Sequence, residues 1–224
     1  MNPALRHSAA HVFVDRLDTP VLAADDLHHL SRVLRLRDGE AVSLSDGVGG
    51  WRVGEWRAGV VVPVGEIHRE VAPRSCVVAS AIPKGDRADW MVQKLTELGA
   101  TELIFLHCAR SVVRWEGDRG AKQLARMTRI SREAAVQSRR VWLPMLRGPV
   151  PLADVVAIPG SVVLDPDGSE AFGRTSGKVL VIGPEGGFQP DEIAAAPLRC
   201  RLGDTILRVE TAAIAAVSVM LTGD

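Results

Sequence analysis

The stretch KVLVIGPEGGFQPDEI, residues 178–193, runs from an apolar segment into three glycines and then into a segment that favours a helix. Glycines let a backbone approach a ligand closely and adopt positive φ angles, and the first turn of a following helix would offer free N–H donors. We therefore predict a ligand-binding loop at residues 183–187 and a helix at 190–195; a tight strand-to-helix turn without a ligand is the alternative. The loop matches neither the dinucleotide-binding nor the Walker pattern.

The residues around this loop alternate between strand and helix patterns. Gly99 is placed to end one of the helices, in which Trp90, Leu95 and Leu98 are expected to pack inward. Strands that alternate with helices are typical of a parallel α/β sheet. The predicted strands are residues 76–82, 102–108, 161–165, 178–183 and 199–203, and the predicted helices are 87–100, 120–140 and 210–221.

The first 70 or so residues have a different pattern, with short strands and glycine-containing turns. Residues 11–14 and 58–67 favour strands, residues 23–36 a short helix, and the Asp46-Gly47 pair a hairpin turn between two alternating runs. Such a pattern suggests a compact β-barrel. Residues 68–75 are polar and aperiodic, so we predict two domains, 1–72 and 73–224.

Composition narrows the class of protein. Hydrophobic residues make up 46% of the chain and charged residues 24%, which is typical of a globular protein. No uncharged apolar run of 18 or more residues and no signal-peptide core appear, so we expect a cytoplasmic protein without a membrane segment. Cys76, Cys108 and Cys200 form no CxxC pair and no HExxH is present, so we expect free buried thiols and no metal.

The net charge is zero, but arginines gather in one part of the chain. Residues 84–147 contain 13 Lys or Arg and 7 Asp or Glu, a local excess of +6. Guanidinium groups suit phosphate, so this region favours a nucleic-acid partner; a solvated helix face is the alternative. Candidate phosphate contacts are Arg110, Arg114, Arg132, Arg139 and Arg140. Lys84 and Arg87 follow the C-terminal end of a predicted strand, which is the usual position of active-site groups in open α/β sheets.

A second candidate loop occurs in RLGDTILRVETAAIAAV, residues 201–217. Arg208 and Glu210 flank the start of a helix that is otherwise made of Ala, Val and Ile. One reading is an ion pair with an acid on the helix dipole. The other is a second ligand loop, in which apolar side chains hold a flat ring and backbone groups bind its edge.

Six motifs occur along the chain in this order: HHLSRVLRLRDGE, PKGDRADWMVQKLTELGA, CARSVVRW, EAAVQSRRVWLP, VIGPEGGFQPDEI and LGDTILRVETAA. Together they resemble the bacterial 16S rRNA (uracil-N3) methyltransferase family of the SPOUT superfamily. The similarity spans nearly the whole chain. It implies an N-terminal PUA-like β-barrel that binds RNA, a C-terminal α/β domain with a deep trefoil knot, S-adenosylmethionine as methyl donor, 16S rRNA of the small ribosomal subunit as partner, and a homodimer.

The resemblance also implies which residues bind the cofactor and which bind the RNA. The sequence departs from the family at Val209, where a hydroxyl residue is usual, and at Val136. The expected RNA contacts are His29, Arg32, Arg35, Lys84, Arg87, Arg110, Arg139 and Arg140. The expected cofactor contacts are Leu164, Ile182, Gly183, Pro184, Glu185, Gly186, Gly187, Leu202, Gly203, Ile206, Leu207, Thr211 and Ala212.

Methylation at uracil N3 requires that a proton leave the ring nitrogen. We expect Arg208 to stabilise the anion that forms and Glu210 to act as the base or to hold Arg208. Glu185 is expected to accept a hydrogen bond from a ribose hydroxyl or to fix its own loop. Two other functions stay open: a SPOUT enzyme with another target, such as a tRNA ribose 2′-hydroxyl, and a non-catalytic protein that binds RNA or assists ribosome assembly.

Overall fold

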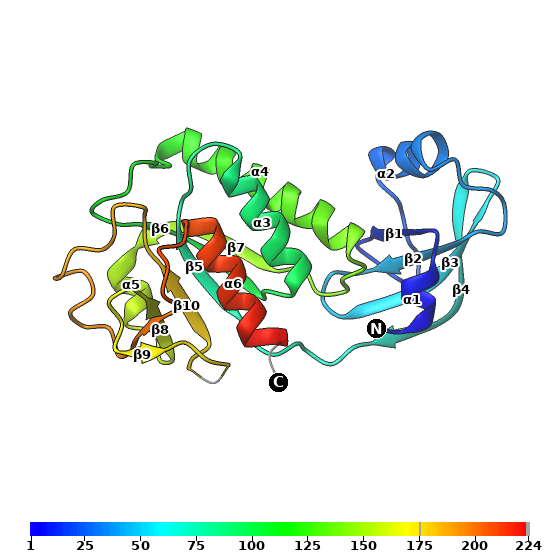
Figure 1. Ribbon diagram of the computed structural model, residues 1–224. Coiled ribbons are helices and arrows are strands. Elements are labelled where there is room, and N and C mark those ends of the chain that lie inside the picture. Colours follow the sequence, from blue (N-terminus) through cyan, green and yellow to red (C-terminus); the bar gives the residue numbers. More distant parts are fainter. Residues whose placement is uncertain (175, 223–224) are drawn as a thin grey trace. The chain divides into compact units, whose positions relative to one another are not determined.

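The computed structural model describes residues 1–174 and 176–222 and has two compact units (Figure 1). The first unit contains residues 1–73 and 135–143, and the second contains 74–134 and 144–224. Residues 135–143 therefore belong with the N-terminal part of the chain. The domains predicted from the sequence, 1–72 and 73–224, had placed these residues in the second domain.

The first unit is built on a four-stranded sheet in the order β1-β2-β3-β4. The first pair is parallel and the other two are antiparallel. Leu30, Val42, Leu44 and Trp56 are buried in its core. The segment expected as one helix at 23–36 is a short α-helix continued by a π-helical turn. The elements are α1 (Pro3–His7), β1 (Ala10–Phe13), α2 (Ala24–His28), η1 (His29–Val33), β2 (Ala41–Ser45), β3 (Gly50–Arg57) and β4 (Val60–Arg69).

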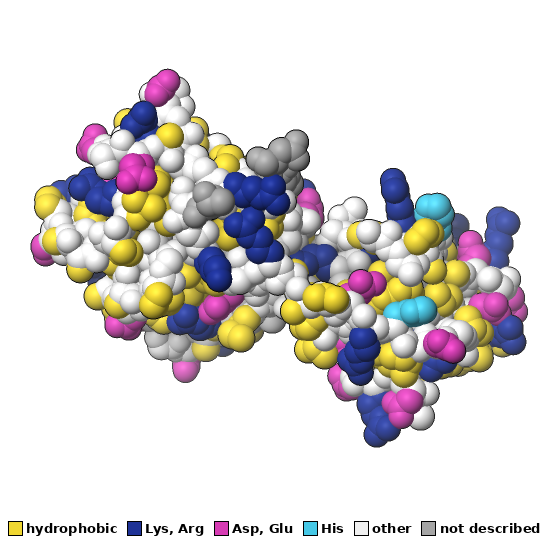
Figure 2. Space-filling view, turned by 90° about the horizontal axis from the view of Figure 1, so that it is seen from below, with side chains coloured by type: hydrophobic (Ala, Val, Ile, Leu, Met, Phe, Trp, Pro, Cys, Tyr) yellow, Lys and Arg dark blue, Asp and Glu magenta, His cyan; other side chains and the backbone are white. Residues whose placement is uncertain are grey.

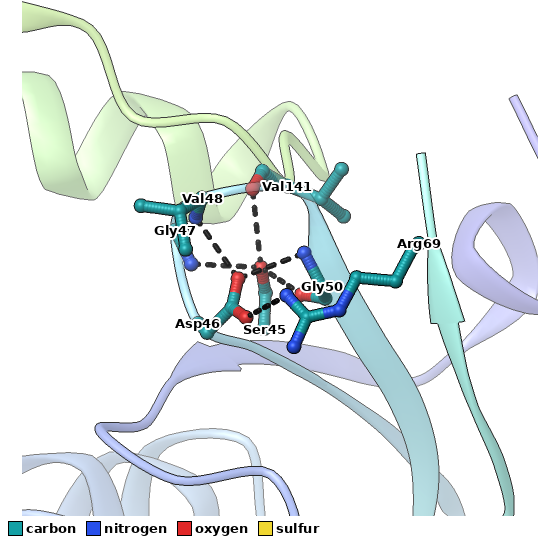
Figure 3. A network of polar contacts seen from close by, with 7 residues as sticks. All are labelled: Ser45, Asp46, Gly47, Val48, Gly50, Arg69 and Val141. Atoms are coloured by element: carbon teal, nitrogen blue, oxygen red, sulfur yellow. Dashed lines mark hydrogen bonds and ion pairs between the residues drawn. The ribbon is translucent and has the colours of Figure 1, made fainter. Parts of the chain in front are cut away.

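The turn between β2 and β3 is the predicted hairpin, and Asp46 holds it together (Figure 3). One carboxylate oxygen of Asp46 accepts hydrogen bonds from the Val48 and Gly50 amides at 2.9 and 2.8 Å, and the other lies 2.8 Å from Arg69 on β4. Bonds of an aspartate to nearby backbone amides are what makes this residue common in turns. The turn is thus fixed to its own strand pair and to the edge strand.

The segment 135–143 completes the first unit through backbone contacts with this hairpin. The Gly49 amide donates to the Val141 carbonyl at 2.8 Å. Buried His11 on β1 lies 2.7 Å from the Ser43 hydroxyl and 3.0 Å from the Arg140 carbonyl. Burial lowers the pKa of His11 to about 4, so the ring is neutral near pH 7.

The second unit has a seven-stranded sheet in the order β7-β6-β5-β10-β8-β11-β9. Every strand pair in it is parallel, so the predicted parallel α/β sheet is confirmed. The strands are β5 (Val77–Ala81), β6 (Glu102–His107), β7 (Met145–Pro151), β8 (Ser161–Leu164), β9 (Glu170–Ala171), β10 (Val179–Ile182) and β11 (Arg199–Arg201).

Both faces of this sheet are buried, which explains why its central strands are apolar without alternation. Leu180 on β10 belongs to the core on one face, together with residues of α3, α4 and α6. Its neighbour Val181 belongs to the core on the other face, with α5. The helices are α3 (Arg87–Leu98), α4 (Gly117–Gln137), α5 (Leu152–Val156) and α6 (Val209–Thr222).

Two local predictions on the helices have different outcomes. Gly99 ends α3 in the left-handed region at φ 108°, as its position predicted. Trp90 was predicted to pack inward, but its side chain is 47% exposed, so that prediction is wrong. The buried face of α3 is formed by Ala88, Met91, Val92, Leu95 and Thr96.

The helix predicted at residues 190–195 is absent. The segment consists of turns, in which the Glu192 amide donates to the Gln189 carbonyl and Ala196 donates to Ile193. The Glu192 carboxylate accepts from the Ala109 and Gln189 amides at 2.7 and 2.9 Å. This side chain therefore connects the segment to the loop after β6.

Among residues 1–174 and 176–222, none of the helices combines the length and the apolar composition that a membrane span requires.

Candidate active site

The carboxyl ends of four neighbouring strands, β5, β10, β8 and β11, lead into the loops of the candidate site. Ligands of open α/β sheets bind at this edge, because the loops there converge above the strand ends. Three of these loops enclose a cavity. It is lined by Leu164, Asp165, Pro166, Ile182, Gly183, Pro184, Glu185, Gly187, Phe188, Leu202, Gly203, Thr205, Ile206, Leu207, Val209 and Ala212.

The loop at residues 183–187 needs its glycines for two separate reasons. Gly187 has φ 72°, a left-handed conformation that side chains disfavour. A Cβ on Gly183 would stand 2.7 Å from the Phe188 ring, so a side chain there would clash. Arg110 donates to the Gly186 carbonyl at 3.0 Å. The backbone of Gly183 and Gly187 therefore lines the cavity without a side chain.

Glu210 is the buried charged residue of the site. Its exposed fraction is 4%, and its Oε2 atom has no hydrogen-bond donor among the described residues. Its Oε1 atom lies 3.7 Å from Arg87 Nη1, and the same nitrogen lies 3.6 Å from Glu185 Oε1. One guanidinium on α3 therefore connects the glycine loop with the first turn of α6.

Arg208 does not form the expected ion pair with Glu210. Its side chain is exposed, and among the residues that the structure describes the cation within ion-pair distance of Glu210 is Arg87. The sequence suggested an ion pair between Arg208 and Glu210, but the ion pair that Glu210 forms is with Arg87. Arg87, expected as an RNA contact, lies between Glu185 and Glu210.

Most of the residues expected to bind a cofactor line the cavity. Gly186 and Thr211 are not among the lining residues. Val209, within the cofactor loop expected at residues 206–212, also lines the cavity. Sequence reasoning missed Asp165, Pro166, Phe188 and Thr205. Asp165 and Pro166 directly follow a buried strand, and this position at a strand end could have indicated them. Phe188 and Thr205 are adjacent in sequence to residues that were expected.

The residues expected to contact RNA lie in both units. His29, Arg32 and Arg35 are exposed on or just after η1, and Lys84 is exposed in the loop after β5. Arg139 differs from these: its guanidinium donates to the Ser8 carbonyl at 2.8 Å and its φ is 57°. Burial lowers its pKa. Arg139 thus has a structural contact within the first unit.

Cysteines and potential metal ligands are the other residue types that could carry chemistry. The three cysteines are free and buried, and burial raises the pKa of the Cys108 thiol to about 12, with the Glu192 charge as a second cause. A thiol with such a pKa is a poor nucleophile. Within residues 1–174 and 176–222 no group of three or more His, Cys, Asp or Glu is placed to hold a metal ion.

Comparison with protein-family models gives two matches. An RNA methyltransferase domain matches residues 70–221. An RNA methyltransferase PUA domain matches residues 22–55. The second match confirms the type of N-terminal domain expected from the sequence.

Relatives of known name agree with these models. Ribosomal RNA small subunit methyltransferase E of Mycobacterium tuberculosis is 34% identical over 93% of this chain and 89% of its own length. The protein of the same name from Bacillus subtilis is 29% identical, over 92% and 91% of the two chains.

Solved structures show the same fold over nearly the full length. A structure described as a methyltransferase of Legionella pneumophila with bound SAM has a TM-score of 0.82 at 28% identity and covers 95% of this chain and 97% of its own. Ribosomal RNA small subunit methyltransferase E of Neisseria gonorrhoeae, bound to S-adenosylmethionine, has a TM-score of 0.80 at 27% identity and covers 96% and 98%. The chain therefore belongs to the ribosomal RNA small subunit methyltransferase E family of RNA methyltransferases.

Proposed function

We propose that this protein uses S-adenosylmethionine to methylate N3 of a specific uridine in 16S rRNA of the small ribosomal subunit. The observation that carries the proposal is the buried Glu210, whose Oε2 atom lacks a donor and whose sequence neighbour Val209 lines the glycine-containing cavity, in a chain of this family. Relatives named for methylation of small-subunit rRNA support the substrate class.

The cavity suits S-adenosylmethionine in its chemistry. Apolar side chains, among them Leu164, Ile182 and Leu202, offer a surface for a flat ring, and the backbone at Gly183 and Gly203 is accessible to polar groups at its edge. The cofactor has no phosphate, which agrees with turns rather than a helix N-terminus after residue 187. When bound, it would supply a methyl group on a positively charged sulfur.

Uracil N3 must lose its proton before it can act as a nucleophile. In the proposal, Glu210 Oε2 accepts this proton, since it is a carboxylate oxygen to which no described residue donates a hydrogen bond. Arg87 holds the other oxygen of Glu210 in place. Arg208, exposed at the start of α6, stabilises the negative charge that develops on the uracil carbonyl oxygens.

RNA binding is assigned to local clusters of basic residues, because the whole chain has no net charge. On the face drawn in Figure 2, basic, acidic and hydrophobic side chains are interspersed. In the first unit, the exposed His29, Arg32 and Arg35 are proposed to contact phosphates. In the second, Lys84 and Arg110 border the loops of the candidate active site.

A homodimer and a trefoil knot in the second unit are further parts of the proposal. A cytoplasmic location is also proposed, because ribosomal RNA is found there in bacteria. Helix α6 has few polar side chains. Val219 on α6 is 38% exposed, and Trp90 on α3 is 47% exposed. These exposed apolar side chains support the proposal that a second copy of the chain packs against α3 and α6.

The experiment that tests the proposal measures transfer of a labelled methyl group from S-adenosylmethionine to 30S subunits, naked 16S rRNA and tRNA. The expected acceptor is ribosomal RNA from a strain that lacks this modification. Label in tRNA alone would favour the other SPOUT activity. Absence of cofactor binding in a calorimetric titration would favour the non-catalytic alternative.

A further inference from the structure

The turn at residues 108–111, directly after β6, is closed by two hydrogen bonds of its own. The Ser111 amide donates to the Cys108 carbonyl at 3.0 Å, and the Cys108 amide donates to the Ser111 hydroxyl at 3.1 Å. Cys108 is buried, and the strand before it pairs with both β5 and β7. The turn is therefore a fixed support at the edge of the sheet that carries the candidate active site.

The glycine loop at residues 183–187 contacts this turn through the one residue of the loop that does not line the cavity. Gly186 is absent from the lining, whereas the other four residues of the loop belong to it. The Gly186 carbonyl accepts a hydrogen bond from Arg110 Nη1 at 3.0 Å, and a Cβ on Gly186 would stand 3.3 Å from Arg110 Cβ. The loop thus has one side toward the cavity and the other against Arg110.

Glu192 holds the end of the same loop from outside the cavity. Its Oε2 atom accepts from the Gln189 amide at 2.9 Å, and its Oε1 atom accepts from the Ala109 amide at 2.7 Å. Gln189 follows Phe188, whose ring lies against Gly183 and lines the cavity. Hydrogen bonds to an ionised acceptor are stronger than those between neutral groups. Glu192 does not line this cavity, so it can affect a ligand there only through the backbone that it holds.

We propose that Glu192 and Arg110 are positioning residues for cofactor binding, which hold the glycine loop in the conformation that S-adenosylmethionine requires. The contacts close a ring, because Ala109, bound by Glu192, precedes Arg110, which binds Gly186. A loop held at its middle and at its end is ordered before the ligand arrives. A loosened loop would be competent only part of the time, and the apparent affinity would fall by that fraction.

The inference rests on the proposed function, since it takes S-adenosylmethionine as the ligand of the cavity. It also gives Arg110 a second role. The sequence indicated Arg110 as a phosphate contact, whereas its bond to Gly186 acts on the cofactor loop and requires no RNA.

The test is calorimetric binding of S-adenosylmethionine to the full-length wild-type protein, Glu192→Gln and Glu102→Gln. Glu192→Gln keeps the shape of the side chain but replaces one acceptor oxygen by an NH2 group, which would face a backbone N–H. Glu102 is the matched control, because it is a partly buried carboxylate at the other end of β6. Arg147 binds it at 2.6 Å, and it does not line the cavity.

We expect the Kd for the cofactor to rise by about fivefold or more in Glu192→Gln, as for a loop that is competent about a fifth of the time. It should stay unchanged in Glu102→Gln. The kcat with saturating cofactor and 30S subunits should also stay unchanged in Glu192→Gln, because the bound ligand orders the loop. Hydrogen exchange of residues 183–192 without cofactor should be faster in Glu192→Gln, and saturating S-adenosylhomocysteine should restore the wild-type rate.

Arg110→Ala provides the second position, and it decides alone if Glu192→Gln does not fold. Measured without RNA, it should weaken cofactor binding in the same way, which a role in RNA binding alone would not do. Wild-type affinity in either folded variant, or a lower kcat with unchanged Kd, would overturn the inference and leave the proposed function standing. A wild-type protein that binds no S-adenosylmethionine would overturn both.

Discussion

At the scale of single residues, Glu210 combines burial, an oxygen without a donor and a position in the first turn of α6. Glu210→Gln replaces the carboxylate by an amide of the same shape that cannot accept the N3 proton. We expect kcat for methyl transfer to fall by roughly 10²–10⁴-fold, as for the loss of a general base, with cofactor affinity nearly unchanged. Glu97→Gln, on α3, should retain full activity.

The measurement for Glu210 is a rate with labelled cofactor and saturating 30S subunits, together with a calorimetric Kd for the cofactor. A Glu210→Gln variant that turns over at the wild-type rate would exclude proton acceptance by this residue. Loss of cofactor binding in parallel with activity would instead assign Glu210 to the cofactor cavity.

Arg87 is predicted to act as a positioning residue, because its guanidinium lies between Glu185 and Glu210. Arg87→Ala removes the cation that faces both carboxylates. We expect at least a tenfold lower kcat and a weaker affinity for the cofactor, since Glu185 belongs to the cavity lining. Arg87→Lys should restore part of both, which an effect on folding alone would not produce. A role of Arg87 only in RNA binding would raise KM for 30S subunits and leave the cofactor Kd unchanged.

The residue types of this site could be predicted from the sequence, but the way they pair could not. The resemblance indicated Arg208 and Glu210, and they are close in the chain, so pairing them was the simplest reading. Arg87 and Glu210 are separated by more than half of the sequence. They meet because α3 and α6 pack on the same face of the sheet, and this depends on tertiary structure.

At the scale of elements, the glycine loop at residues 183–187 offers a matched pair of substitutions. Gly187 has φ 72°, whereas Gly186 has no positive φ, and a Cβ there would stand 3.3 Å from the flexible side chain of Arg110. Gly187→Ala should cost about 1 kcal/mol or more through backbone strain and weaken cofactor binding by fivefold or more. Gly186→Ala should change it less. Calorimetry on both variants provides the comparison, and equal affinities would show that the loop conformation does not limit binding.

The same stretch shows why part of the element assignment was wrong. Residues 190–195 have helix-forming side chains and a proline suited to a first turn, but only six residues separate Pro190 from Pro197. Helix nucleation is unfavourable, so a segment this short depends on packing. Here Glu192 accepts a hydrogen bond from the Ala109 amide of another loop, and Ile193 is buried against the sheet. These contacts stabilise turns in place of the helix.

The central strands of the second unit could be predicted because they are buried on both faces and read as continuous apolar runs. The edge strands β7 and β9 were not predicted. The order of the strands could not be predicted. Strand β10 lies between β5 and β8, so the glycine loop is placed beside the loop after β5 by a crossover that no local pattern encodes.

At the scale of the whole molecule, residues 135–143 show the limit of reading domains along the chain. They follow the long basic helix in sequence, yet they belong with the first unit through His11, the β2–β3 turn and the Val141 carbonyl. A composition change marked the boundary near residue 73. Nothing comparable marks residue 135, because the helical pattern of α4 continues across it.

The buried His11 predicts how the stability of the first unit depends on pH. Its pKa is lowered to about 4 by burial, so the unfolded chain binds a proton below about pH 6.5 that the folded unit excludes. The free energy of unfolding should fall as the pH drops from 6.5 to 4, by about 3 kcal/mol at most. Urea unfolding followed by tryptophan fluorescence measures this, and His11→Gln should lose the part of the dependence due to His11. A wild-type profile identical to that of His11→Gln would contradict the prediction.

Methyl transfer to uracil N3 is tested by locating the methyl group in the RNA. Small subunits that lack the modification are incubated with the protein and labelled S-adenosylmethionine, and the RNA is digested to nucleosides for mass spectrometry. We expect a single 3-methyluridine in 16S rRNA, formed by the wild-type protein and not by Glu210→Gln. A methyl group on a ribose, on another base or on no RNA, from a protein that binds the cofactor, would contradict it.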